Sequence, residues 1–324
     1  MSHGLSPEIR EWLKQEGWGK AGVEPVLGGS NNRVYRIRNE AKSQLLKIST
    51  SQPDDPRNRF LAEKEFYDLF EEKPLPGVPR RYAFDETLKA TLYEWIEGTT
   101  VRSPVGQKEL KSALEFLVGI QGTHCGAIDR KASEACFSIS EHRSIIQGRI
   151  EKILGHPRSE KAILQIVRDE VVPRWQQVEE GLTKLGRADF KGHHGRKILS
   201  PGDFGFHNAI RRLQGDIVFF DFEYSGFDDP AKTVADIFLQ PEQPVDFTYW
   251  HGFCHQLAER VELDLAFAFR ANALLPLFAV KWSCILAHGL IKRNVEPSSD
   301  EQSLQIEKIR CVLSRGMTFS REIL

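Results

Sequence analysis

Short apolar runs typical of strands fill the first hundred residues of this 324-residue chain, and helical patterns fill most of the rest. Strand signals lie around 26–27, 34–37, 45–48, 79–84 and 90–96, rich in Val, Ile, Leu, Tyr and Phe. From residue 106 onward the periodicity becomes helical, as in the stripe Leu110, Leu114, Leu117 and Ile120. Further helices are expected within 141–186 and over 246–265, 265–290 and 303–319. Strands followed by helices predict an α+β protein.

One helix is expected inside the strand-rich part. Asp55 suits the N-cap and Pro56 the first helical position, so the helix is predicted over residues 56–72. At 100° per residue, Glu65 falls on a polar arc with Lys64, Asp68, Glu71 and Glu72. Glu63 falls on the opposite, apolar face, among Phe60, Phe66, Tyr67 and Phe70. An acid on that face needs a buried partner, because leaving it unpaired is costly.

Lys47 is the obvious partner for Glu63, because it lies within the apolar run Leu45-Leu46-Lys47-Ile48. Glu65 is the weaker choice. The alternative interpretation of Lys47 is an ordinary lysine on the solvent face of a half-buried strand, which strand alternation allows equally well.

Composition and charge narrow the class of protein. Hydrophobic residues make up 40% and charged residues 27%, and a net charge of −1 provides no global field for nucleic acid or an anionic membrane. Five scattered cysteines without a Cys-x-x-Cys pair argue against disulfides or structural zinc and favour a reducing, cytoplasmic location. The N-terminus lacks a signal pattern. The longest apolar run, 273–280, is shorter than the roughly 20 residues of a membrane helix and is interpreted as a core helix interrupted at Pro276.

The strongest motif is the stretch Ser200-Pro201-Gly202-Asp203-Phe204-Gly205-Phe206-His207-Asn208. Asp203 precedes Asn208 by five residues, and an apolar run then ends in Asp221-Phe222-Glu223. Phosphoryl transfer from ATP needs these groups: a carboxylate to orient a hydroxyl, and an amide plus an acid to hold magnesium. No Walker-type phosphate loop occurs in the chain, which argues against a P-loop enzyme.

With this motif the chain resembles the aminoglycoside-phosphotransferase and choline-kinase-like family, the small-molecule branch of the protein-kinase fold. That family's loop reads His-Gly-Asp-x-x-x-x-Asn, and Pro201 stands here in place of the histidine. The resemblance implies a two-lobed fold, with a small β-rich lobe over residues 1–97 and a larger helical lobe over 98–324. It also implies phosphorylation of a small-molecule hydroxyl, with ATP and Mg²⁺ as cofactors.

The resemblance assigns roles residue by residue. Asp203 would be the catalytic carboxylate, and Asn208 and Asp221 would hold the metal. Lys47, paired with Glu63, would contact the ATP phosphates. The glycine-rich turn, with Gly29, Ser30 and Asn31, would cover the phosphates, although an ordinary hairpin turn is an equal alternative. The backbone at Glu94 and Ile96 would receive the adenine.

Several points stay open at this level. A nucleotide-binding pseudokinase is the rival hypothesis, and Pro201 is the residue that favours it. A protein-directed kinase is disfavoured, because no long activation segment follows Asp221. A sugar, amino sugar or amino alcohol is the expected acceptor.

His207 is interpreted as a loop-shaping residue, since Asp203 already holds the matched position. His124 is interpreted as a core or capping residue. The adjacent His193 and His194 are not interpreted as a metal site, because neighbouring histidines usually point apart. The family places an acid where this chain has Thr233, with Asp236 three residues later.

Overall fold

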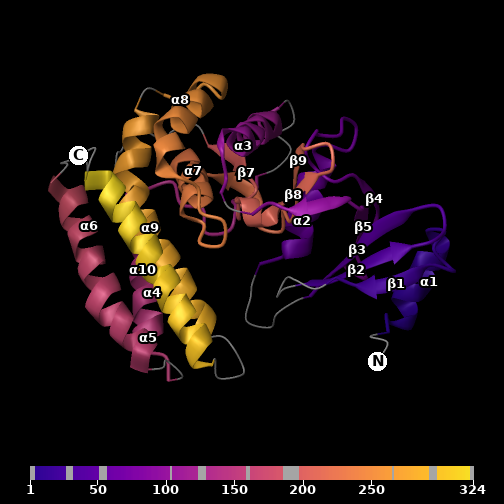
Figure 1. Cartoon of the computed structure of the whole chain (residues 1–324), viewed down its shortest axis with the longest axis horizontal. Coiled ribbons are helices and arrows are strands. Elements are labelled where there is room, and N and C mark those ends of the chain that lie inside the picture. Colours follow the sequence, from indigo (N-terminus) through magenta and orange to yellow (C-terminus); the bar gives the residue numbers. More distant parts are fainter. Residues whose placement is uncertain are drawn as a thin grey trace.

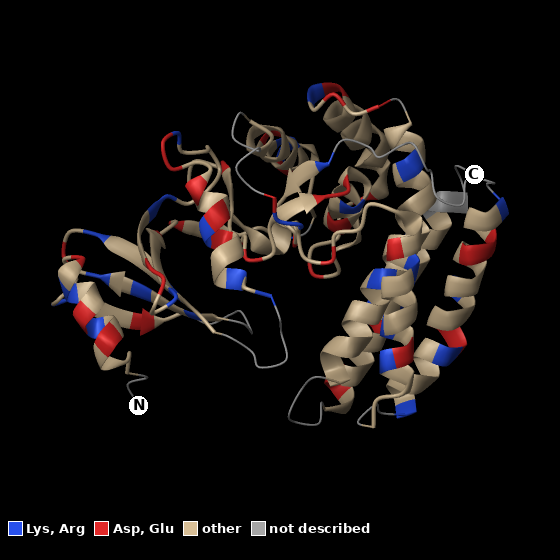
Figure 2. Ribbon diagram, turned by 180° about the vertical axis from the view of Figure 1, so that it is seen from behind, with Lys and Arg blue, Asp and Glu red and all other residues tan. Residues whose placement is uncertain are grey.

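The computed structural model describes residues 4–26, 32–50, 57–102, 104–122, 129–157, 161–184, 197–264, 266–291 and 298–321. Two lobes lie side by side, a smaller one built on a sheet and a larger one built mainly of helices (Figure 1). The predicted two-lobed α+β arrangement is confirmed. Acidic and basic residues are interspersed along the elements of both lobes (Figure 2), as the near-zero net charge leads one to expect.

The small lobe is a five-stranded antiparallel sheet with strand order β1-β2-β3-β5-β4. Its strands are β1 (Gly22–Pro25), β2 (Asn32–Arg38), β3 (Ser43–Ser49), β4 (Arg81–Asp85) and β5 (Ala90–Glu94). Helix α1 (Pro7–Gln15) packs its buried residues Ile9, Trp12 and Leu13 against the sheet, where Ile37 and Leu46 are fully buried. These contacts form a small core of their own.

Helix α2 (Arg59–Asp68) is shorter than predicted. The N-cap is Asn58, whose side chain accepts a hydrogen bond from the Leu61 amide at 3.1 Å, so the predicted start at Asp55-Pro56 is wrong. Residues 51–56 themselves lie outside the described part of the chain. The predicted end at residue 72 is also wrong. After Asp68 the chain tightens, and the Phe70 amide bonds three residues back to the Tyr67 carbonyl.

The large lobe contains two small sheets framed by helices. One sheet has the order β6-β8-β9, and in the other β7 pairs with β10. These strands are β6 (Gly98–Thr100), β7 (Ile198–Ser200), β8 (Ala209–Arg212), β9 (Ile217–Phe219) and β10 (Gly226–Asp228). Near them lie α3 (Gln107–Ile120), α7 (Pro230–Leu239) and α8 (Trp250–Arg260), with short 3-10 turns η3 (Phe206–Asn208) and η4 (Phe247–Tyr249).

The helices farthest from the small lobe form a bundle (Figure 1). It comprises α4 (Ile139–Leu154), α5 (Lys161–Ile166), the π-helical turn η2 (Val167–Val171), α6 (Val172–Lys184), α9 (Phe267–Ile291) and α10 (Ser299–Arg321). The predicted interruption at Pro276 is wrong, because α9 continues through it for 25 residues. A proline removes one backbone donor, and here the packing of α9 against α10, α7 and α4 holds the helix together.

By length and composition α9 could cross a membrane, with a mean hydropathy of 1.7 over its most apolar window. However, 78% of that window is buried inside the protein, so the helix serves as the centre of the large lobe's core.

The large core reaches across the lobe boundary. Phe66 and Tyr67 of α2 and the C-cap residue Leu69 belong to it, together with Tyr93 near the end of β5. Phe66 is fully buried and stacks on Phe222, with ring centroids 4.1 Å apart. Helix α2 is therefore packed as part of the large lobe, although its sequence lies within the small one.

Candidate active site

Lys47 lies at the centre of a carboxylate cluster between the lobes. Its ammonium Nζ is 2.7 Å from Glu63 Oε2 and 2.6 Å from Asp221 Oδ1. The Lys47 and Glu63 side chains are only 8% and 6% exposed. The predicted pairing of Lys47 with Glu63 is confirmed, and the alternative of a lysine on the solvent face is wrong.

A third carboxylate, that of Glu223, completes this cluster. It lies 3.8 Å from Lys47 Nζ and accepts a hydrogen bond from Asn32 Nδ2 at 2.7 Å. Burial lowers the pKa of Lys47, but Asp221 and then Glu63 and Glu223 raise it, and the net pKa lies above its usual value. The lysine is therefore charged at any physiological pH.

One ammonium faces three carboxyl groups, and burial raises the pKa of Glu63 while Lys47 lowers it. Carboxylate oxygens of this kind suit a hard divalent cation. Among the described residues no three His, Cys, Asp or Glu side chains form a ready metal cage.

Asp221 is held in an unusual backbone conformation. Its φ is +68°, in the left-handed region that non-glycine residues rarely adopt. The next residue, Phe222, is buried between Phe66 and Phe116, with centroid distances of 4.1 and 5.8 Å. Packing of this ring fixes the backbone and keeps the Asp221 carboxylate against Lys47, a placement typical of strained functional residues.

The loop predicted to be catalytic begins where β7 ends. Gly202 has a φ of +84°, and a Cβ there would lie 2.1 Å from the Tyr224 carbonyl oxygen, so the position requires glycine. Asp203 follows, with its side chain 35% exposed. Asn208 donates from Nδ2 to the Asp203 carbonyl at 3.2 Å, which leaves its amide oxygen for a ligand. The Asn208 carbonyl accepts from the Phe220 amide at 3.0 Å, which brings Asn208 next to Asp221.

Gly29, Ser30 and Asn31 lie outside the described residues, and their role stays a prediction. Glu94 lies at the end of β5, where its side chain binds Arg212 at 2.8 Å, and Ile96 is buried just before β6. Both lie at the junction of the lobes, so the predicted backbone contact with adenine stays open.

Other predicted features have mixed outcomes. Glu65 lies on the polar face of α2 and does not pair with Lys47, as predicted, but it is half-buried and binds Arg130 through two hydrogen bonds of 2.7 and 3.1 Å. Asp229 caps α7, and Thr233 donates to its carbonyl, while Asp236 accepts from Lys232 and Trp282. The three histidines at 124, 193 and 194 lie outside the described residues.

Two site residues escaped sequence reasoning. Glu223 was noted in the Asp-Phe-Glu run but not assigned to the lysine cluster, although the two-residue spacing from Asp221 was visible. Asn32, its partner, is the last residue of the predicted glycine-rich turn over residues 28–32, but no contact with Glu223 was predicted for it. His207, expected only to shape the loop, has Nε2 3.3 Å from Asp203 Oδ2.

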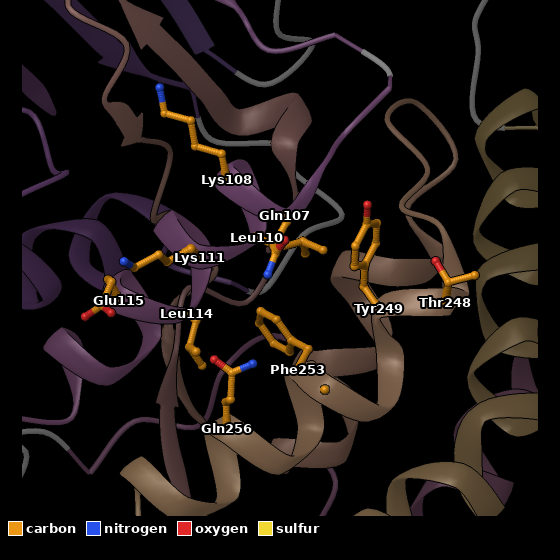
Figure 3. Close-up of a pocket in the computed structure, with 11 residues that line it drawn as sticks. Gln107, Lys108, Leu110, Lys111, Leu114, Glu115, Thr248, Tyr249, Phe253 and Gln256 are labelled. Carbon is orange, nitrogen blue, oxygen red and sulfur yellow. The ribbon is translucent and has the colours of Figure 1, made fainter.

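A separate hollow of about 660 Å³ lies between α3 and the segment formed by η4 and α8 (Figure 3). Lys108, Lys111, Tyr249 and Phe253 are among its lining residues. None of the predicted site residues lines it, so it is distinct from the cluster around Lys47.

The arrangement of a sheet-based lobe beside a helical lobe is a protein-kinase-like fold. The family model described as "Phosphotransferase enzyme family" matches residues 22–269, and the chain belongs to that family. A search of curated proteins gives no match.

Solved structures with the same fold include the choline kinase LicA from Streptococcus pneumoniae, with 18% identity, a TM-score of 0.62, and coverage of 95% of this chain and 98% of that one. Spectinomycin phosphotransferase APH(9)-Ia, in complex with ADP and spectinomycin, gives 12% identity, a TM-score of 0.62, and coverage of 99% and 100%. An ethanolamine kinase from Plasmodium vivax gives 14% identity, a TM-score of 0.55, and coverage of 96% and 86%.

Proposed function

We propose that this protein transfers the γ-phosphate of ATP to a hydroxyl group of a small molecule in a Mg²⁺-dependent reaction. The observation that carries the proposal is the cluster in which the buried Lys47 contacts both Glu63 and Asp221, and Asp221 follows the strand that is bonded to the Asp203–Asn208 loop. A structural salt bridge alone does not require a strained Asp221 or an excess of acid around the lysine.

Each side chain has a distinct task in this proposal. Asp203 accepts a hydrogen bond from the acceptor hydroxyl and orients its oxygen toward the γ-phosphorus. Lys47, held by Glu63, contacts the ATP phosphates. Asn208 and Asp221 hold Mg²⁺, which when bound neutralises the phosphate charge that develops during transfer.

The acceptor is proposed to be a sugar, an amino sugar or an amino alcohol. Structural neighbours include a choline kinase, an ethanolamine kinase and a phosphotransferase in complex with spectinomycin, which supports a small hydroxyl compound as the class. Identities of 12–18% cannot select among them. A cytoplasmic location is proposed from the free cysteines, three of which are buried.

The second candidate is a nucleotide-binding pseudokinase. Pro201, in place of the family histidine, favours it. The lysine cluster and Asp203 favour the enzyme, because a binding scaffold needs no carboxylate poised for a hydroxyl.

A coupled ADP-release screen over sugars, amino sugars, choline-like alcohols and aminoglycosides tests the proposal, with wild type and Asp203→Asn in parallel. An acceptor should stimulate ADP release by the wild type, and Asp203→Asn should lower turnover by about 10²- to 10⁴-fold, because it loses the orienting carboxylate. Nucleotide affinity, measured by calorimetry, should stay near that of the wild type. Nucleotide binding without any acceptor-dependent turnover would favour the pseudokinase, and full turnover by Asp203→Asn would remove Asp203 from the mechanism.

A further inference from the structure

The catalytic loop alternates between buried and cleft-facing side chains. Phe204 and Phe206 are 2% and 0% exposed and pack against Phe219 at 5.3 and 5.8 Å between ring centroids. The chain then turns at η3 (Phe206–Asn208), where the Asn208 amide bonds back to the Gly205 carbonyl at 3.1 Å, and this turn brings His207 back toward Asp203.

His207 approaches the proposed catalytic carboxylate directly. Its Nε2 lies 3.3 Å from Asp203 Oδ2, and its side chain is 19% exposed. The other ring nitrogen, Nδ1, is buried and has no hydrogen-bond partner among the described residues. A neutral imidazole carries one N–H, and the carboxylate can only accept, so the geometry favours the tautomer with hydrogen on Nε2.

Gly205 makes room for the ring. A Cβ at this position would lie 2.7 Å from His207 Nδ1 and 2.9 Å from Gln240 Cγ, closer than such atoms pack. Gln240 cannot easily retreat, because it is 4% exposed and its Oε1 accepts hydrogen bonds from the Glu242 and Gln243 amides. The glycine is required here for space and not for its backbone angle.

We infer that His207 is a positioning residue that orients Asp203 for transfer. At 3.3 Å, Nε2 is close enough to Oδ2 for its N–H to donate there, which would restrict rotation of the carboxylate and leave Oδ1 to meet the acceptor hydroxyl. Pro201, two residues before Asp203, offers neither a side-chain donor nor a backbone N–H. The donor to Asp203 is instead supplied by His207, four residues after it in the chain. This inference rests on the proposed function, in which Asp203 acts on the hydroxyl.

Kinetics of His207→Ala and His207→Gln test the inference, with His255→Ala, on the exposed face of α8, as the control. Losing a hydrogen bond to a charged group corresponds to about 10- to 100-fold. His207→Ala should lose that much in kcat, with the ATP KM within about twofold of wild type. His207→Gln should recover a large part, because its Nε2 can reach the carboxylate.

Two further variants separate positioning from folding. Gly205→Ala should displace the ring and reproduce the kcat loss while His207 remains in the sequence. In an Asp203→Asn background, adding His207→Ala should cost little more, because the two side chains act as one unit. Additive losses of kcat in the Asp203→Asn, His207→Ala double variant would overturn the inference. A His207→Gln variant no more active than His207→Ala would also overturn it. Either result suffices if one of the other variants does not fold.

Nitrogen NMR of the unliganded protein gives a readout that needs no acceptor. With the proton on Nε2, the His207 ring should show one protonated and one bare nitrogen, and Asp203→Ala should change that signal. If no acceptor is ever found but the signal responds, the proposed activity fails and the contact stands. If the signal indicates hydrogen on Nδ1, or ignores Asp203→Ala, the positioning role is wrong.

Discussion

Glu63 and Glu65, two residues apart on α2, should differ sharply in their effect on catalysis. Glu63 holds the buried Lys47, whereas Glu65 binds Arg130 with both side chains about 30% exposed. In Glu63→Ala the ammonium loses one charged hydrogen bond, about 1.5–3 kcal/mol, which corresponds to about 10- to 150-fold in kcat/KM for ATP. Glu63→Gln keeps the shape and a neutral acceptor, so about 1 kcal/mol, or about fivefold, is expected.

Stability should respond differently from kinetics. When Glu63 is replaced, Lys47 still has Asp221 at 2.6 Å as a partner. The loss of unfolding free energy should therefore be smaller than the about 3–5 kcal/mol expected when a buried charge is left wholly unpaired. Glu65→Gln should leave kcat/KM within about twofold and lower unfolding free energy by about 0.2–1 kcal/mol, as for exposed pairs.

Steady-state kinetics with varied ATP, together with urea unfolding of all three variants, make the comparison. The reasoning is refuted if Glu65→Gln loses catalysis while both Glu63 variants keep it, because the structure would then have the wrong acid facing the nucleotide.

Two other substitutions probe the metal and a buried histidine. Asp221→Ala should abolish transfer and weaken Mg-ATP binding, because no neutral side chain replaces a metal-bound carboxylate. Calorimetry with Mg-ATP and with metal-free ATP checks this. Equal Mg-ATP affinities of the variant and the wild type would mean that the metal binds elsewhere. His142 is fully buried, and burial followed by repulsion from Lys281, Lys232 and Arg270 holds its pKa well below its usual value of 6.5. Below pH 6.5 the unfolded chain binds a proton at His142 that the folded protein does not, so the free energy of unfolding should fall by up to about 1.4 kcal/mol per pH unit as the pH is lowered. His142→Leu should remove this contribution. Urea unfolding of both proteins at pH 7 and pH 5.5 checks this, and an equal loss of stability in the two proteins would contradict it.

Local chemistry explains what could be predicted from the sequence. The face of α2 that carries Glu63 was predictable, because a helix repeats every 3.6 residues whatever its ends do. Its ends were not, since Asn58 and Asp55 are both good caps and the choice depends on surrounding packing. The loop from Asp203 to Asn208 was recognisable because its chemistry fixes both residue type and spacing.

Long-range contacts explain what could not be predicted. Arg130 comes to Glu65 from 65 residues away, and no local pattern announces it. Continuation of α9 through Pro276 depends on three neighbouring helices. The contact of His207 with Asp203 is local, yet it depends on which face the buried Phe204 and Phe206 take.

The packing of α2 bears on whether the two lobes are separable units. A cut at residue 97 would leave Phe66, Tyr67 and Leu69 on the smaller fragment without the aromatic neighbours they have in the large core, notably Phe222. Lys47, by contrast, lies on β3, whose Leu46 and Ile48 belong to the small core. The bond between Lys47 and Glu63 therefore joins a strand of the small core to a helix of the large core. Separating β3 from α2 would have to break this ion pair, so the two lobes share it as part of one structure.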